Sequence, residues 1–140
     1  MIFAHQSREQ LRNAWREAYQ RQQTRLPLEP LQAQMAQVLD LHPEYALILA
    51  AGPAAPADAG GAAADSAFLH LGLHLALLEQ VGTDRPPGIR QVYTALCARR
   101  GDAHQAAHGM MEVLAQALWD AQRAGRAPDE QAYLERLRRL

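Results

Sequence analysis

The chain has 140 residues, of which 49% are hydrophobic and 21% are charged, and its formal net charge is −1. This length suits one folded domain. The near-neutral charge excludes the strongly basic surface of a general nucleic-acid-binding protein and does not favour binding to anionic membranes. The single cysteine, Cys97, excludes an intrachain disulfide. With no charged leader and no apolar run of membrane-spanning length expected, we predict a soluble cytoplasmic protein without nucleic-acid or membrane partners.

The first two predicted elements are helices. Ser7 followed by Gln10 is a capping-box start for a helix that extends to about Gln23. The apolar stripe of this helix consists of Leu11, Trp15, Ala18 and Tyr19. Four charged residues fall largely outside the stripe and are expected to face water: Arg8, Arg12, Arg16 and Glu17. The second helix begins near Pro30, and its apolar face is formed by Leu31, Met35, Val38 and Leu39.

A break and a loop should follow the second helix. Pro43 lacks a backbone donor and should interrupt or kink that helix close to His42. Residues 51–65 are almost wholly Ala, Gly and Pro, a composition typical of a flexible surface loop. We do not expect this loop to separate two domains, because neither side has a complete core alone.

The third helix is predicted to be the central, buried one. It can be capped by Asp65 or Ser66 and extends to about Val81. Large apolar residues cover nearly its whole circumference: Phe68, Leu69, Leu71, Leu73, Leu75, Leu77 and Leu78.

Three more helices complete the predicted fold. One runs from the turn at residues 84–88 to about Arg100, and the next from Asp102 to about Ala124. A short last helix opens at Pro128 and Asp129. Both tryptophans, Trp15 and Trp119, are expected to be packing residues. The sequence therefore predicts an all-α, single-domain helical bundle of about five to six helices over residues 1–140.

Histidines are the most informative residues of the chain. His70 and His74 are spaced i, i+4 on the third helix, and His104, His108 and Glu112 occupy successive turns of the fifth. Residues four apart lie on the same face of a helix, so each pair can direct two imidazoles at one point. His42, with Asp40 two residues before it and Glu44 two residues after it, adds a third cluster of donors.

These clusters predict a metal site. A buried imidazole must satisfy both a donor and an acceptor, and a metal satisfies the acceptors of several imidazoles together. Glu112 stands beside Met111 and Ala115, so its face is expected to point inward, where a carboxylate needs a partner or a metal. If the third and fifth helices pack together, their donors converge. The predicted metal ligands are His42, His70, His74, His104, His108, Glu112 and Glu44.

The number of donors bears on the metal. Five histidines and two carboxylates exceed the needs of one four-coordinate zinc ion, which favours a dinuclear iron site that binds or activates oxygen or peroxide. Zinc and manganese are also compatible with these ligands. The donor inventory is similar to the iron site of the hemerythrin family, but the spacing differs, so no residue role is transferred from it.

Two other functions fit the same residues. The first is a mononuclear zinc-type hydrolase or transferase, in which Glu112 or Glu44 acts as general base. The second is a non-catalytic helical adaptor whose histidines are structural. A single i, i+4 pair is often a hydrogen-bonded core pair, so the metal hypothesis depends on the three clusters occurring together.

Several stretches carry a resemblance to a bacterial family known only as a domain of unknown function. They run from about Ser7 to Arg138 and comprise His42-Pro43-Glu44-Tyr45, Phe68-Leu69-His70-Leu71 with Leu73-His74-Leu75, Pro86-Pro87-Gly88-Ile89-Arg90, Gly101-Asp102, His104, His108, Met110-Met111-Glu112 and Leu118-Trp119. The resemblance implies no activity, so the function must be inferred from the residues themselves.

Overall fold

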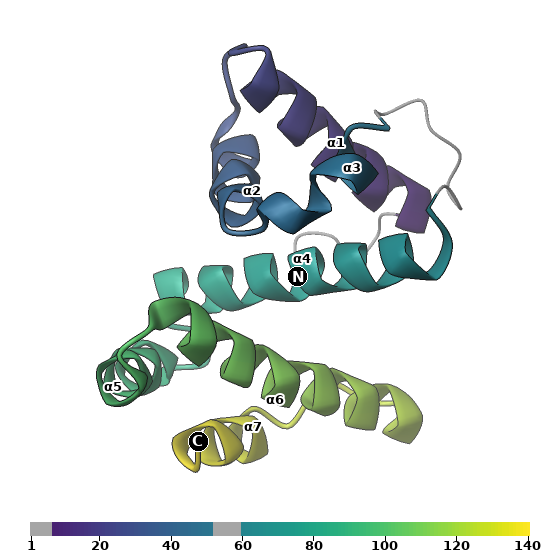
Figure 1. The fold of residues 1–140 in the computed structure, drawn as a ribbon. Helices are drawn as coiled ribbons and strands as arrows, with labels where there is room; N and C mark the ends of the chain where they lie inside the picture. Colours follow the sequence, from purple (N-terminus) through teal and green to yellow (C-terminus); the bar gives the residue numbers. More distant parts are fainter. Residues whose placement is uncertain (1–6, 52–59) are drawn as a thin grey trace. The chain divides into compact units, whose positions relative to one another are not determined.

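The computed structural model describes residues 7–51 and 60–140, and within these ranges the chain is helical with no strand (Figure 1). The elements are α1 (Arg8–Gln23), α2 (Pro30–Asp40), the short 3-10 helix η1 (Pro43–Tyr45), α3 (Ala46–Leu49), α4 (Gly61–Thr83), α5 (Ile89–Arg100), α6 (Ala103–Ala124) and α7 (Glu130–Arg138). The all-α prediction is confirmed. The described ranges contain seven α-helices rather than five or six, and the four-residue helix α3 is too short to show an apolar period.

The chain divides into two compact units, Met1–Leu75 and Ala76–Leu140, and the division falls inside α4. Each unit is described by itself. The expectation of a single domain stays a prediction.

The first unit packs α1 against α2 and α3. At the start of α1, the Ser7 hydroxyl accepts a hydrogen bond from the Gln10 amide at 3.1 Å, and the Ser7 amide donates to the Gln10 side chain at 2.9 Å, as the capping box predicts. The break at Pro43 is also confirmed, because α2 ends at Asp40 and η1 begins at Pro43. The buried apolar residues of these elements include Trp15, Ala18, Met35, Val38 and Leu49.

Helix α4 begins earlier than the sequence predicted. Residues 61–65 are helical, so they do not belong to a loop, and Asp65 lies inside the helix instead of capping it. Three consecutive alanines, residues 62–64, explain the difference, because alanine has the highest helix propensity. Residues 52–59 of the predicted loop lie outside the described residues.

The apolar character of α4 is pronounced, but the helix is not buried on all sides. Leu71 and Leu77 are fully buried, whereas Leu69 is 65% exposed. Helix α4 has 23 residues and contains an 18-residue segment with a mean hydropathy of 1.3, so it is long and apolar enough to cross a membrane, contrary to the expectation that no stretch would be. A core helix of a soluble protein has the same properties, and 44% of this segment is buried, which is consistent with a soluble protein. A cytoplasmic location stays a prediction.

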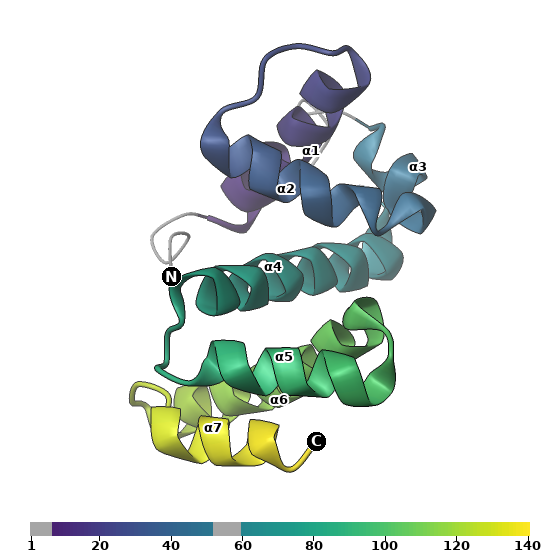
Figure 2. The ribbon, with the colours of Figure 1, turned by 90° about the vertical axis from the view of Figure 1, so that its left-hand side faces the viewer.

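The second unit packs α6 against both α5 and α7 (Figure 2). Gly101 and Gly125 end α5 and α6 in the left-handed conformation, with φ of 68° and 66°, where glycine carries no Cβ penalty. Asp102 caps α6, and its carboxylate accepts hydrogen bonds from the amides of His104 and Gln105. Trp119 is 56% exposed, so the expectation that it is a packing residue is wrong; the buried face of α6 ends at Leu114.

Candidate metal centre

Three of the predicted ligands come together inside the first unit. His42 lies between the end of α2 and η1, and its backbone is fixed by a hydrogen bond from its amide to the Leu39 carbonyl at 3.0 Å and another from the Tyr45 amide to its own carbonyl at 3.1 Å. His70 and His74 lie one turn apart on α4. The break in the helix at Pro43 thus allows the His42 side chain to reach α4.

The three imidazoles share one small volume. One ring nitrogen of each lies within 4.8 Å of those of the other two. His42 Nε2 and His74 Nδ1 are only 3.1 Å apart. The ring centroid of His42 is 4.6 Å from that of His70 and 5.3 Å from that of His74. His42 and His74 are buried, at 2% and 1% exposure, whereas His70 is half-buried.

This spacing fits a metal ion. Two nitrogens that each lie about 2.0–2.1 Å from a tetrahedral zinc ion are about 3.3 Å apart, close to the separation of His42 Nε2 and His74 Nδ1. Three neutral imidazoles match the preference of zinc, copper, iron and nickel for nitrogen ligands. A small movement of the rings would therefore replace the contact between two histidines by coordination of one ion.

Glu44 approaches His42 from the other side of the ring. Its Oε1 lies 2.9 Å from His42 Nδ1, and its side chain is 57% exposed. A carboxylate beside Nδ1 favours the tautomer with the proton on Nδ1, in which Nε2 carries the lone pair that a metal would use. This contact suits Glu44 to orient His42, and metal binding by Glu44 itself stays a prediction.

Tyr45 stacks on one face of the His42 ring. The two rings are stacked with centroids 5.2 Å apart and an angle of 16° between their planes. Burial, and secondarily the charge of Glu44, raise the pKa of Tyr45 above its ordinary value, so the phenol stays protonated at neutral pH.

A pocket of about 200 Å³ opens beside His42. Its polar lining includes Tyr19, Gln22, Gln23 and Asp40, and Gln22 donates a hydrogen bond of 2.8 Å to the Asp40 carboxylate. Sequence reasoning missed the contribution of α1 to this pocket, because glutamines at the end of an amphipathic helix carry no pattern. Asp40 belongs to the donor cluster that the sequence predicted around His42, and it lines this pocket.

The remaining predicted ligands belong to the second unit. His104 and His108 lie on α6 with ring centroids 4.0 Å apart, as their one-turn spacing requires. Glu112 is exposed, so the expectation that its face points inward is wrong. The buried face of α6 is formed by Ala106, Ala107, Met110, Met111 and Leu114, and one residue beyond Met111 a helix has turned by about 100°. Metal binding by His104, His108 and Glu112 stays a prediction.

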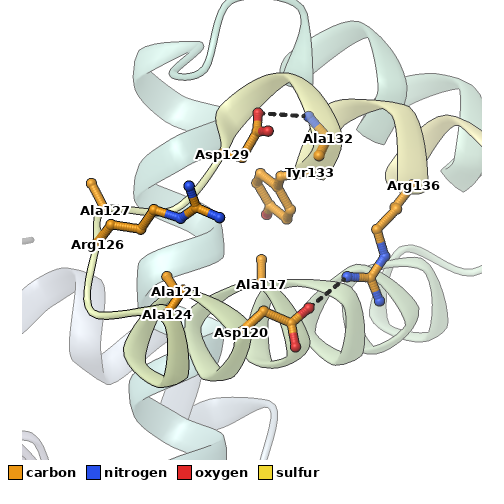
Figure 3. A pocket seen from close by; sticks show the side chains of 10 residues that line it. All are labelled: Ala117, Asp120, Ala121, Ala124, Arg126, Ala127, Asp129, Ala132, Tyr133 and Arg136. Carbon is orange, nitrogen blue, oxygen red and sulfur yellow. Dashed lines mark hydrogen bonds and ion pairs between the residues drawn. The ribbon is translucent and has the colours of Figure 1, made fainter.

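The second unit also has a pocket of about 260 Å³ between α6 and α7 (Figure 3). Half of its lining residues are alanine, and both of its carboxylates are already engaged: Asp120 pairs with Arg136 at 3.6 Å, and Asp129 accepts a hydrogen bond from the Ala132 amide at 3.1 Å. The Tyr133 hydroxyl donates to the Gln80 side chain at 2.7 Å. These contacts account for both carboxylates and the tyrosine of the pocket, and we assign the pocket no chemical function.

Comparison with known proteins gives one match. Residues 7–139 match a family model described as "Domain of unknown function (DUF1841)". No curated protein and no solved structure matches the chain.

Proposed function

Since the chain belongs to the DUF1841 family, whose description names no activity, we propose a function from its own residues. The protein binds a transition metal ion through His42, His70 and His74. The centre binds or activates a small molecule such as oxygen or peroxide.

The observation that carries this proposal is the cluster of imidazoles. Two histidines with a structural role can satisfy each other's hydrogen-bonding groups as a pair. Here three rings from two segments of the chain direct nitrogens into one volume. Glu44 fixes the ring orientation of His42 from outside, as carboxylates do for metal-binding histidines.

The pocket supports a small ligand. It is lined by His42, so a molecule in it lies next to the proposed centre. At about 30 Å³ per water molecule, its 200 Å³ corresponds to about six or seven waters. Drug-sized molecules occupy about 300–1,000 Å³, so this pocket suits a ligand of a few heavy atoms. Gln22 and Asp40 form a polar wall that can hydrogen-bond such a molecule.

Iron is the favoured metal because the chain contains more donors than a single zinc ion uses. His104, His108 and Glu44 would supply further ligands if the centre holds two ions, as the sequence predicts. When bound, iron would supply redox chemistry. The residues of the first unit would hold it, orient His42 and limit access through the pocket.

One observation favours a second function, a zinc-type hydrolase. Three histidines with an open position are a common catalytic zinc set, in which the ion lowers the pKa of bound water to about 7. Asp40, which lines the pocket beside His42, would then be a candidate general base together with Glu44.

The deciding experiment is metal analysis of the untagged protein purified without chelator, with its visible spectrum. Iron near two ions per chain with oxygen-sensitive bands would support the redox centre, and one colourless zinc would favour hydrolysis. The variants His42→Ala and His74→Ala should lose the metal, whereas His5→Ala, which removes a histidine outside the predicted ligand set, should keep it. No metal in the wild type after reconstitution with iron, zinc and manganese would contradict the proposal and favour the helical adaptor.

A further inference from the structure

The arginines of α1 differ sharply in environment. Arg8, Arg12 and Arg16 are spaced i, i+4, and all three were expected to face water. The side chain of Arg8 is 68% exposed, but Arg12 is only 3% and Arg16 only 1% exposed. The expectation is therefore wrong for Arg12 and Arg16, and two buried cations lie one turn apart in the first unit.

Their partners are also different. Asp65 on α4 pairs with both Arg8 and Arg12 through one carboxylate oxygen. All three guanidinium nitrogens of Arg16 are buried and have no hydrogen-bond partner among the described residues. Asp65 thus serves two of the three guanidinium groups, and Arg16 has no acceptor among the described residues.

Phe68 explains only part of this arrangement. The guanidinium carbons of Arg12 and Arg16 lie 4.9 and 5.1 Å from the centroid of its ring. The attraction of a cation to an aromatic ring is weaker than the cost of burying an unpaired charge. Burial, followed by the charge of Arg12, lowers the pKa of Arg16, but an arginine remains protonated at neutral pH. Within residues 7–51 and 60–140, no acidic side chain forms an ion pair with Arg16.

A second buried polar group without a partner lies one turn from Arg16 on α1. Asn13, three residues before Arg16, has a side-chain oxygen that is buried and has no partner. The two ends of an amide can exchange by rotation, so Asn13 can present its NH₂ group as a donor. Residues i and i+3 are neighbours on a helix, so both side chains can serve one ligand.

We propose that Arg16, with Asn13, forms a binding site for a small oxyanion, a phosphate or carboxylate group, on the inner face of α1. A guanidinium donates two parallel hydrogen bonds to such a group, which supplies both the acceptor and the missing negative charge. The site is separate from the proposed metal ligands and does not depend on the proposed function. Because the nitrogens of Arg16 are buried, the anion enters only after local opening, and binding should be slow.

The test compares thermal and urea unfolding of the full chain in chloride, acetate and inorganic phosphate at equal ionic strength, after long incubation. A bound anion stabilises the folded state, so the unfolding midpoint of the wild type should rise in phosphate, acetate or both. A response to phosphate alone identifies the phosphate source, and a response to acetate identifies carboxylates.

Two arginine variants make the test specific. Arg16→Met should weaken anion binding by at least about tenfold, the equivalent of one charge-assisted hydrogen bond, as measured by calorimetric titration with the responding anion. Arg8→Met removes the same charge from an exposed position and should leave the response unchanged. Arg16→Gln provides a polar alternative if the methionine variant does not fold.

Two results would overturn the proposal: a wild type that responds to neither anion, or an Arg16 variant that keeps the full response. Metal content measured on the same variants separates this proposal from the previous one. Arg16→Met should retain the metal that His74→Ala loses.

Discussion

The role of Glu44 beside His42 depends on the negative charge of its carboxylate. Its carboxylate faces His42 Nδ1 at 2.9 Å, and replacing it by glutamine keeps the shape but removes the charge that favours the metal-binding tautomer. We expect Glu44→Gln to lower metal affinity by about 10–100-fold, measured by competition with a chromophoric chelator. Glu112→Gln, at an exposed position on α6, should leave the affinity unchanged. A loss of affinity in the Glu112 variant alone would assign the ligand role to Glu112.

Side-chain environments were the part of the site least accessible from the sequence. Spacing placed His70 and His74 on one face of a helix, but their meeting with His42 depends on how the turn at Pro43 returns the chain to α4. The amphipathic pattern predicted that Arg16 faces solvent, because such a pattern does not take contacts between a cation and an aromatic ring into account. In the structure, the guanidinium of Arg16 lies over the ring of Phe68. The same patterning misplaced Glu112, where a rotation of one residue separates a buried position from an exposed one.

Helix boundaries were predicted well wherever a local hydrogen bond sets them. The Ser7 and Asp102 caps and the terminal glycines at 101 and 125 all act within one turn of the helix end, so neighbouring residues suffice to identify them. The start of α4 has no described side-chain cap, and an alanine run next to glycines and a proline fits a loop and a helix equally well.

Tyr133 ties α7 to the end of α4 within the second unit. The hydroxyl is bonded to Gln80 and the residue is 4% exposed, so Tyr133→Phe should cost about 0.5–1.5 kcal/mol of unfolding free energy, measured in urea at pH 7. Tyr19→Phe, on the half-exposed face of α1, is the matched control. No loss in the Tyr133 variant would mean that water replaces the hydroxyl at no cost.

Tyr133 also affects the stability of the folded state at alkaline pH. Burial raises the pKa of Tyr133 above the unfolded value of about 10, so its protonated form is stabilised by folding. This contribution is complete below about pH 10 and is lost as the pH rises toward the folded pKa, because the unfolded chain ionises first. The wild type should therefore lose stability above pH 10 more steeply than Tyr133→Phe.

The division into two units gives the whole molecule a spatially resolved test of metal binding. Hydrogen exchange of the apo and metal-loaded protein should show slower exchange at residues 42–46 and 70–74, because a ligand suppresses local opening around its site. Added protection at residues 104–112 would indicate that the histidines of α6 also bind the metal. Unchanged exchange in the first unit of a metal-loaded chain would contradict the assignment of His42, His70 and His74.

The size of the pocket beside His42 has a consequence for how the protein would exchange its metal with the surroundings. A space equivalent to a handful of water molecules admits a diatomic gas, peroxide or azide, but not a polyaminocarboxylate chelator. His42 and His74 are almost completely shielded, so a large chelator must wait until the protein opens. Metal release should then proceed at a rate independent of chelator concentration, while small ligands reach the same ion without delay.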